Sequence, residues 1–396
     1  MRVAIIGQGY VGLTIAVGAA SAGHSVVGFD VNNILIAKLK TGKSHIEGIS
    51  DDQLKGLIAS GAYTASADAS VLEGSDVIVI AVPTPLDEDR NPDLSFVHRA
   101  SDLISRHVKS PALIVNESTS YPGTLRKEIA GRITGVEHLY ASSPERVDPG
   151  NMNWGTKNTP RLLGGLTSTA VSKAREFYGS FCDSIIEVSS PEVAEAAKIF
   201  ENTFRQVNIA LVNEFAQIAD ALGFSSREVI DAAATKPYGF MAFNPGPGVG
   251  GHCIPVDPSY LAHVANEVGV PATFIKRANE VNLAMPAYVV KRVVTSNGGS
   301  VKGKKVVIVG VSYKSNVADT RETPAAAVID LLREQGATVI WHDDLVGNWR
   351  GESSSPIAGA DIAIVVTKHD SVDVNTIKTC NYVFDCTGHI AGVDGI

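Results

Sequence analysis

Short runs of apolar residues recur along the N-terminal half of the chain, and each run ends in small or polar residues. The runs occupy residues 3–6, 25–29, 76–82, 113–116 and 139–141. Unbroken apolar runs of this length are typical of parallel strands that are buried on both faces of a sheet. Their alternation with helical segments predicts a doubly wound, Rossmann-like α/β domain over residues 1–190.

The pattern changes at residue 191, where apolar residues recur at helical spacing and strand-like runs stop. Helices are predicted at 191–221, 226–234, 260–268 and 272–294. We therefore expect a helical middle domain over residues 191–295. The long helix at its start suits the pairing of two subunits, so a homodimer or a higher homo-oligomer is expected.

A glycine- and serine-rich linker at 296–300 precedes a return to the strand pattern. Strands are predicted at 304–310, 338–341, 361–366 and 382–385, with a helix near 324–335. Residues 300–396 are thus predicted to form a second Rossmann-like domain. The expected fold class is α/β, with two doubly wound domains joined by a helical middle domain that has a long central helix.

Composition narrows the classes of function. The 396 residues carry a net charge of −8, which argues against a nucleic-acid or anionic-membrane surface. No apolar run reaches the length of a membrane span, and the N-terminus is typical of a strand rather than of a signal peptide. The four cysteines have neither metal-ligand spacing nor the pattern of a disulfide framework. A reducing, cytoplasmic setting without a metal cofactor is the expectation.

A glycine pattern directly after the first predicted strand indicates dinucleotide binding. Gly7 makes the turn, Gly9 admits a pyrophosphate, and Gly12 lets the following helix approach the sheet. Asp30 ends the second strand, where a carboxylate accepts from ribose hydroxyls and repels a 2′-phosphate, so NAD is favoured over NADP. The predicted NAD contacts in this region are Gly7, Gly9, Tyr10, Val11, Gly12 and Asp30.

Polar residues also follow three further strands of the first predicted sheet. They are Pro83 and Thr84, the segment 117–120 with Thr119, and Glu145 with its neighbours. Any one of these could serve only turn chemistry or helix capping. Because carboxyl ends of parallel strands meet at one edge, all three together favour a binding site there.

One thiol lies at the end of a glycine-rich stretch. Cys253 follows four glycines in the segment 246–258, and Asp257 comes four residues later. Glycines let a ligand approach the backbone, and prolines stiffen the loop. Taken alone, the pattern fits a tight structural turn with a buried cysteine equally well.

Two other patterns offer charged groups. Glu195, Lys198, Asn202 and Arg205 fall three to four residues apart, so they share one face of the long helix. That face is either solvated or lines a cleft. The loop 312–323 follows the first strand of the second α/β domain and carries two cations, which are either surface charges or phosphate ligands.

Together these features resemble the UDP-glucose/GDP-mannose dehydrogenase family over essentially the whole chain. The resemblance rests on GQGYVG (7–12), ESTSYPGT (117–124), SPERVDPGN (143–151), KIFENTFRQVNIALVNE (198–214), GPGVGGHCIPVDP (246–258) and YKSNVADTRETP (313–324). It implies an enzyme that oxidises the C6 alcohol of a nucleotide sugar to a carboxylate with two NAD⁺. A nucleotide-sugar-binding C-terminal domain and a role in polysaccharide biosynthesis are implied as well.

The resemblance also implies roles for residues. Cys253 would be the nucleophile, and Lys198 and Asn202 would stabilise the alkoxide. Asp257 and Thr119 would hold the water that acts as base and later attacks, and Glu145 would serve thioester hydrolysis. His252 is disfavoured as the base because adjacent extended residues point in opposite directions. Implied substrate contacts are Glu145, Arg146, Val147, Lys198, Asn202, Phe243, Gly246, Gly250 and Lys314. Implied NAD contacts are Pro83, Thr84, Thr119 and Arg321.

Within the family, the UDP-N-acetylglucosamine 6-dehydrogenase branch is the most similar. Segments 143–147, 201–205 and 236–240 carry that likeness. The UDP-glucose branch has an arginine near 236–238 and an acid four residues after Glu145, where this chain has Pro149. UDP-glucose and UDP-N-acetylmannosamine stay open as alternatives, and the tail at 385–388 departs from the family's Asp-x-Arg-Asn.

Two other functions compete with this one. A β-hydroxyacid dehydrogenase also joins a Rossmann domain to a helical domain, but it leaves the cysteine loop and residues 304–390 unexplained. A non-catalytic regulator that binds NAD or a nucleotide sugar would not require the lysine, asparagine, cysteine and aspartate together.

Overall fold

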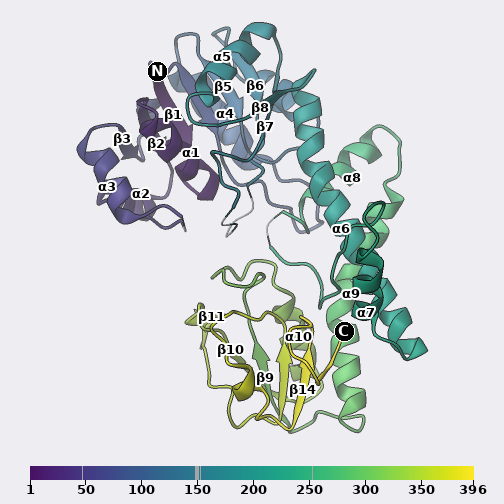
Figure 1. The fold of residues 1–396 in the computed structure, drawn as a ribbon. Coiled ribbons are helices and arrows are strands. Elements are labelled where there is room, and N and C mark those ends of the chain that lie inside the picture. The colour runs from purple at the N-terminus through teal and green to yellow at the C-terminus, as the bar shows by residue number, and fades with distance from the viewer. Residues whose placement is uncertain (47, 148–150, 152, 252) are drawn as a thin grey trace. The chain divides into compact units, whose positions relative to one another are not determined.

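The computed structural model describes residues 1–46, 48–147, 151, 153–251 and 253–396. The chain forms two compact units (Figure 1). One consists of Met1–Glu201 with Ser259–Gly269, and the other of Asn202–Pro258 with Val270–Ile396. Among the described residues, no helix combines the length and apolar character that a membrane span requires.

The first unit is built on an eight-stranded sheet in the order β3-β2-β1-β4-β5-β6-β7-β8. Its strands are β1 (Arg2–Ile6), β2 (Ser25–Phe29), β3 (Tyr63–Ser66), β4 (Val77–Ile80), β5 (Leu113–Asn116), β6 (Leu139–Ser142), β7 (Arg161–Gly165) and β8 (Ile185–Glu187). All neighbours are parallel except β6 and β7. The carboxyl ends of β1, β4, β5 and β6 therefore meet at one edge, as the sequence predicted.

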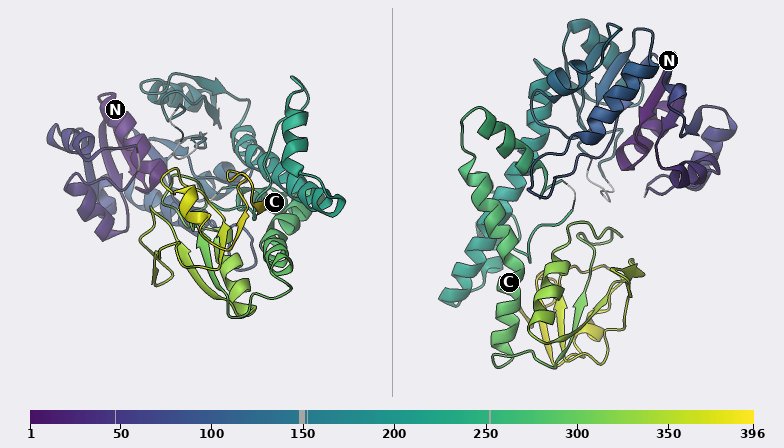
Figure 2. Two further views of the ribbon diagram at one scale, coloured as in Figure 1. Left: turned by 60° about the horizontal axis from the view of Figure 1, so that its bottom comes forward. Right: turned by 180° about the vertical axis from the view of Figure 1, so that it is seen from behind.

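Helices cover both faces of this sheet. Side chains of α1 (Tyr10–Ser21) and α5 (Ser168–Tyr178) share one buried core with Ile5, Val79 and Val115. On the opposite face lies α4 (Ser95–His107) (Figure 2). The remaining helices of this part are α2 (Asn33–Lys40), α3 (Asp51–Ala59), η1 (Ala69–Leu72) and η2 (Leu125–Ala130).

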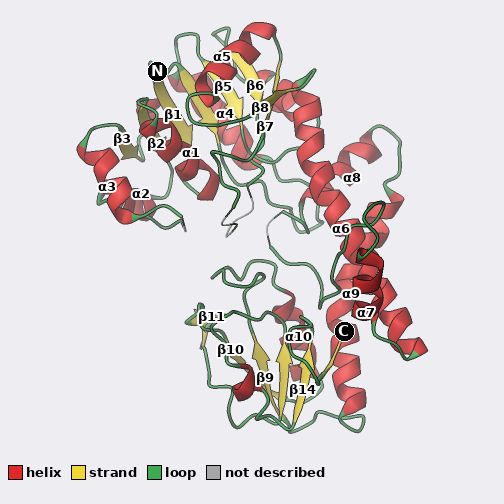
Figure 3. Ribbon diagram, viewed as in Figure 1, coloured by secondary structure: helices red, strands yellow, loops and turns green. Residues whose placement is uncertain are grey.

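The middle of the chain is helical, as predicted (Figure 3). It contains α6 (Pro191–Leu222), α7 (Ser226–Ala234), α8 (Asp257–Glu267) and α9 (Thr273–Ser296). Polar side chains join α6 to α9: Asn213 Nδ2 donates to Asn282 Oδ1 at 2.9 Å, and Asn282 Nδ2 donates to the Gln206 carbonyl at 3.2 Å. These bonds fix the register of the two helices beside a small apolar contact of Ala210 with Ala278 and Val281.

The C-terminal sheet is parallel, in the order β10-β9-β13-β14-β15. Its strands are β9 (Lys305–Val309), β10 (Thr338–His342), β13 (Ile362–Val365), β14 (Tyr382–Asp385) and β15 (Asp394–Gly395). α9 and α10 (Pro324–Glu334) cover one face, and α11 (Val374–Ile377) follows β13. A short hairpin joins β11 (Asn348–Trp349) to β12 (Glu352–Ser353). Strand order reverses between β9 and β13, where open α/β sheets bind ligands.

Candidate active site

The turn between β1 and α1 has the geometry of a dinucleotide cradle. Gly7 has φ +93°, and a Cβ on it would lie 2.3 Å from the Ala81 carbonyl oxygen. A Cβ on Gly12 would lie 1.8 Å from the Gly7 carbonyl oxygen, so no larger side chain fits at either position. Gly9 is exposed and caps α1, and Tyr10 and Val11 form the first turn of that helix. The exposed helix N-terminus fits the diphosphate of NAD.

Asp30 lies beside this turn, as the sequence predicted. Its Oδ2 accepts from the Gln8 N–H at 2.8 Å, and its Oδ1 accepts from the Asn32 N–H at 2.9 Å. Gln8 is itself buried and accepts from the Tyr63 hydroxyl at 2.8 Å. The carboxylate is therefore held in one place at the carboxyl end of β2, where a ribose would lie.

The loops after β4 and β5 are tied together at the same edge. The Val82 N–H donates to Ser118 Oγ at 2.9 Å, next to Pro83 and Thr84. Thr119 follows Ser118 and is half-buried. The Tyr260 hydroxyl of α8 donates to the Pro85 carbonyl at 3.2 Å. The structure thus brings the predicted residues of both loops to one rim of the first unit.

Glu145 lies at the end of β6 and is bound by a buried arginine. Arg161, 4% exposed, forms ion pairs with Glu145 Oε2 at 2.8 Å and with Glu117 Oε2 at 2.9 Å. The Tyr178 hydroxyl donates to Glu117 at 2.5 Å, and its ring lies 4.5 Å from the Arg161 guanidinium. The other oxygen of Glu145 accepts from the N–H groups of Arg146 and Val147 at 2.7 and 2.9 Å. This cluster of Arg161, Glu117, Glu145 and Tyr178 is called the arginine cluster below.

The two carboxyl groups of the arginine cluster differ in pKa. Burial raises the pKa of both, but Arg161 and the two backbone N–H groups outweigh burial at Glu145 and leave its pKa below the ordinary value. At Glu117 burial prevails over Arg161 and raises the pKa to about 7. Glu145 is therefore ionised at neutral pH, while Glu117 is close to half-protonated.

Of the arginine cluster, Glu145 was predicted as a site residue and Glu117 lay within the predicted segment 117–120, but Arg161 and Tyr178 were missed. The available signal was Arg161, a charged residue at the start of an otherwise apolar strand. Arg146, a predicted substrate contact, instead pairs with Glu201 at 2.6 Å and donates to the Pro160 carbonyl at 2.8 Å. Val147 is half-buried, and Pro149 lies outside the described residues.

The polar face predicted on α6 divides into different environments. Lys198 is 9% exposed, and Asn202 follows one turn later on the same face. Asn202 Nδ2 donates to Asp257 Oδ2 at 2.5 Å. Glu195 accepts from the N–H groups of Gly123 and Leu125 at 2.7 and 2.8 Å, so it is a buried structural cap. Arg205 is exposed, so Lys198 and Asn202 are the members of the face that are neither exposed nor used as a structural cap.

Cys253 is the exposed one of the four cysteines, all of which lie among the described residues and none of which is in a disulfide bond. Cys182, Cys380 and Cys386 are buried, and burial raises the pKa of each thiol. The Cys253 carbonyl accepts from the Asp257 N–H at 2.8 Å, at the start of α8. A helix N-terminus favours a thiolate. His252, the disfavoured base, lies outside the described residues.

The glycine-rich loop before Cys253 is held by its neighbours in the second unit. The Gly246 N–H donates to Asn213 Oδ1 at 2.9 Å, and the Gly251 N–H donates to the Arg321 carbonyl at 3.1 Å. A Cβ on Gly250 would lie 2.8 Å from the Tyr313 Cβ, so glycine is needed for this approach. Phe243 contacts Phe204 edge to face, with ring centroids 5.9 Å apart. The loop is thus positioned by α6 and by the segment after β9.

The two cations of that segment differ in their surroundings. Arg321 is exposed and pairs with Asp319 at 2.5 Å. Lys314 is half-buried, near the point where strand order reverses in the C-terminal sheet. Within the second unit, the structure therefore collects a thiol, an acid bonded to an amide, and two cations. Within the first unit, it collects a dinucleotide cradle and a buried acid cluster.

Comparisons with known proteins agree with this geometry. Residues 1–182, 192–284 and 307–391 match, in turn, the NAD binding, central and UDP binding domains of the UDP-glucose/GDP-mannose dehydrogenase family. The chain is 35% identical over 379 residues to a UDP-N-acetyl-D-mannosamine dehydrogenase of Pyrococcus horikoshii, covering 93% of this chain and 90% of that protein.

Two further matches cover most of the chain. A UDP-N-acetyl-D-glucosamine 6-dehydrogenase of Pseudomonas aeruginosa is 35% identical over 345 residues, which are 84% of this chain and 80% of that protein. The solved structure of a UDP-D-ManNAc dehydrogenase from Pyrococcus horikoshii superposes with a TM-score of 0.89 at 32% identity, covering 100% of this chain and 99% of that one.

Proposed function

Because the chain belongs to the UDP-glucose/GDP-mannose dehydrogenase family and is an NAD-dependent nucleotide-sugar dehydrogenase, we propose that it oxidises the C6 alcohol of a UDP-N-acetylhexosamine through a covalent intermediate on Cys253. The observation that carries this proposal is the second unit's arrangement of an exposed thiol, Cys253, four residues before a buried Asp257 that Asn202 binds. A β-hydroxyacid dehydrogenase performs a single hydride transfer, so that function would explain neither this thiol nor the match of residues 307–391 to a UDP binding domain.

The first oxidation removes the hydroxyl proton and a hydride from C6. When bound, NAD⁺ would supply the hydride acceptor, with one NAD⁺ consumed in each of the two oxidations. We assign the proton to a water molecule held by Asp257. Lys198 and Asn202 stabilise the alkoxide that develops on the C6 oxygen, because an ammonium and an amide N–H both favour negative charge there. Asn202 is already oriented by its bond to Asp257.

The second oxidation requires the aldehyde to become a hydride donor again. The Cys253 thiolate adds to the aldehyde carbon and forms a thiohemiacetal, which loses a second hydride and becomes a thioester. Water then attacks the thioester carbon, the C–S bond breaks, and the thiol is regenerated with the carboxylate product. We assign a role in this hydrolysis to Glu145, which Arg161 keeps ionised and able to accept a hydrogen bond.

We propose an N-acetylhexosamine as the sugar, with UDP-N-acetylmannosamine ahead of the UDP-N-acetylglucosamine that the sequence favoured. Several relatives of similar identity are named as UDP-N-acetyl-D-mannosamine dehydrogenases. The relative from Pseudomonas aeruginosa is named as a UDP-N-acetyl-D-glucosamine 6-dehydrogenase. A panel of these two UDP-sugars, UDP-N-acetylgalactosamine and UDP-glucose, with NADH counted by absorbance, tests the choice. Turnover of UDP-glucose alone would contradict the N-acetyl assignment and leave the reaction intact, whereas no NADH from any UDP-sugar would contradict the reaction itself.

We also propose that two copies of the chain associate through α6. Phe204, Leu211, Ile218 and Leu222 are 44–68% exposed and recur at intervals of seven, seven and four residues. This spacing places them on one stripe of the helix, which is the pattern of a helix that packs on a partner. A division into domains at 1–190, 191–295 and 300–396, a cytoplasmic location and a role in polysaccharide biosynthesis stay predictions.

A further inference from the structure

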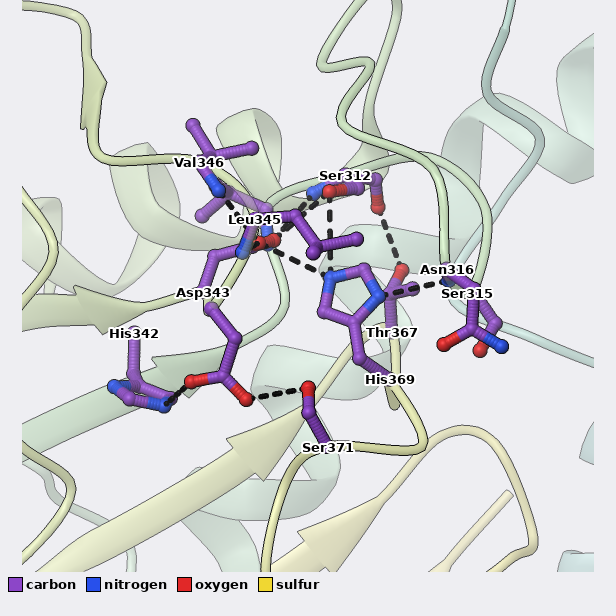
Figure 4. Close-up of polar contacts among 12 residues, drawn as sticks. Ser312, Ser315, Asn316, His342, Asp343, Leu345, Val346, Thr367, His369 and Ser371 are labelled. Atoms are coloured by element: carbon purple, nitrogen blue, oxygen red, sulfur yellow. Dashed lines mark hydrogen bonds and ion pairs between the residues drawn. The ribbon is translucent and has the colours of Figure 1, made fainter. Parts of the chain in front are cut away.

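A buried polar network joins three loops at the carboxyl edge of the C-terminal sheet (Figure 4). Ser312 follows β9, Asp343 follows β10 and His369 follows β13. Asp343 is 3% exposed and His369 is 0% exposed. The network lies where strand order reverses between β9 and β13, the place where open α/β sheets bind ligands.

Both oxygens of the Asp343 carboxylate are saturated by donors. His369 Nε2 lies 3.1 Å from Oδ1, and the Ser312 hydroxyl donates to Oδ2 at 2.9 Å. The other donors are the N–H groups of Val311, Ser312, Leu345 and Val346, at 2.9–3.1 Å. Burial disfavours the charge, but these donors outweigh it and keep the pKa of Asp343 well below its ordinary value.

The His369 ring uses its two nitrogens in opposite ways. Nδ1 accepts from the Asn316 N–H at 2.8 Å, so the proton is on Nε2, which faces Asp343. Asn316 has φ +61°, in the left-handed region that asparagine tolerates. Figure 4 shows the imidazole between Asp343 and this turn. The ring thereby holds the turn at Asn316 in place.

Further bonds tie the segment 312–316 at both of its ends. The Thr367 hydroxyl donates to the Ser312 carbonyl at 2.7 Å. Asn316 Nδ2 donates to Asp370 Oδ2 at 2.8 Å, and the Asp370 N–H donates to Asn316 Oδ1 at 3.0 Å. Ser315 Oγ donates to the Lys368 carbonyl. Lys314 lies between these two anchored ends.

We propose that His369 and Asp343 are positioning residues that fix the backbone of residues 312–316, so that Lys314 meets the phosphates of the bound UDP-sugar. This rests on the proposed function and on the substrate contact that the family resemblance implies for Lys314. Pre-organising a cation in this way lowers the entropy lost on binding an anion. The positioning role also explains why a carboxylate and an imidazole are buried here. Apolar side chains could fill the space, but they could not orient a backbone N–H.

The same segment touches the cysteine loop. A Cβ on Gly251 would lie 2.8 Å from the Tyr313 ring, and Tyr313 is the neighbour of Lys314. The Tyr313 N–H donates to the Asp319 carbonyl at 2.8 Å. The anchoring at His369 therefore reaches the backbone that precedes Cys253 as well as the substrate-binding lysine.

Calorimetric titration of UDP into the full chain tests the proposal. His369→Phe removes both hydrogen-bonding contacts of the ring. It is expected to weaken UDP binding roughly tenfold, which corresponds to the net contribution of about one hydrogen bond. His369→Asn, whose amide oxygen replaces Nδ1 as acceptor for Asn316, is expected to restore UDP affinity to within about threefold. His369→Gln, whose amide replaces Nε2 instead, is expected to stay weak. NAD affinity serves as the internal control and is expected to stay within about twofold in all three.

A double-mutant cycle with Lys314→Met decides whether His369 acts through the lysine. In the Lys314→Met background, His369→Gln should cause no further loss of UDP affinity. Additive losses, or equal losses of UDP and NAD affinity, would mean a general structural role and would overturn the proposal. Unchanged UDP affinity in Lys314→Met would overturn it too, while leaving the oxidation chemistry intact. If His369→Phe does not fold, the Asn and Gln variants decide the question, because each keeps one of the two contacts.

Discussion

At the scale of the residue, the chemistry depends on a few side chains whose charge is set by close neighbours. Arg161 is the most consequential of these because it lies between two buried carboxyls. Its guanidinium keeps Glu145 ionised and leaves Glu117 near half-protonation. One buried cation thus sets the charge of the acid that we assign to thioester hydrolysis.

Arg161→Met should be strongly destabilising. It leaves Glu117 and Glu145 buried without their cation, a loss of about 3–5 kcal/mol in the free energy of unfolding. Denaturation in guanidinium measures this loss. Arg146→Met is the matched control, because it breaks a partly exposed pair with Glu201 and should cost less than about 1 kcal/mol. Equal losses in the two variants would contradict the role given to burial.

The raised pKa of Glu117 predicts how stability depends on pH. Burial raises it from 4.5 to about 7 in the folded chain, so folding favours the protonated form. The contribution of Glu117 is therefore fully present below pH 4.5 and is lost as the pH rises through 7. Glu117→Gln, which does not ionise, should flatten the fall in stability between those values.

Denaturant midpoints of both proteins across this pH range measure the difference. Burial also raises the pKa of Glu195 to about 7, so both carboxyls contribute to the loss of stability in the wild type as the pH rises. The difference between the wild type and Glu117→Gln gives the contribution of Glu117. Parallel curves for wild type and Glu117→Gln would contradict the assignment.

The sequence identified residues that lie in local motifs and missed residues that act through distant partners. Cys253 and Asp257 are four residues apart in one glycine-rich segment, so the family resemblance of that segment identified both. Arg161 meets Glu117 from 44 residues away, a pairing that only the fold creates. Asp343 and His369 follow strands in the same way as the polar residues of the first sheet, but in the C-terminal domain that signal was applied only to the loop 312–323.

At the scale of the element, the middle-domain helices and the predicted strands all lie within three residues of their expected bounds. The predicted range 226–234 agrees with α7, because Ser225 is a favourable N-cap residue. Its hydroxyl oxygen accepts a hydrogen bond from the Glu228 N–H. The short strands β3, β7 and β8 were missed. β8 has three residues and exposed positions, and β7 begins with an arginine, so neither shows an unbroken apolar run. Glu195 had the spacing of a functional face, yet its carboxylate caps a loop and a short helix.

The glycine-rich loop predicts a test at this scale. Gly251 has φ +89°, and a Cβ there would lie 2.8 Å from the Tyr313 ring. Gly251→Ala should displace the backbone next to Cys253 and lower kcat/KM roughly a hundredfold, because catalysis is sensitive to displacements near 1 Å. Gly347→Ala, with no heavy atom within 4 Å of the added Cβ, should leave kcat/KM unchanged. Steady-state kinetics of both variants would contradict the argument if their values were equal.

At the scale of the whole molecule, the order of motifs along the chain made the fold class predictable. Each α/β part begins with an apolar strand and a turn, and the parallel sheets and the long helix α6 confirm the expected architecture. Assembly was indicated only by the length of that helix. The exposed stripe of Phe204, Leu211, Ile218 and Leu222 became visible once burial was known.

Leu211→Glu should convert the proposed dimer to a monomer. It places a charge in the middle of the stripe, where a partner helix would have to bury it without compensation. Light scattering after size exclusion gives the mass of each species. Glu214→Gln, also on the exposed surface of α6, should leave the mass unchanged. A dimer that persists in Leu211→Glu would place the interface elsewhere.

The central claim is that one thiol carries the substrate between two oxidations. The most direct test is the amount of NADH formed per UDP-sugar consumed, in the wild type and in Cys253→Ala, with Cys380→Ala as a control on a buried cysteine. The wild type and the control should form two NADH per sugar and release the uronic acid, and Cys253→Ala should not sustain turnover. Two NADH per sugar from Cys253→Ala would contradict the covalent mechanism.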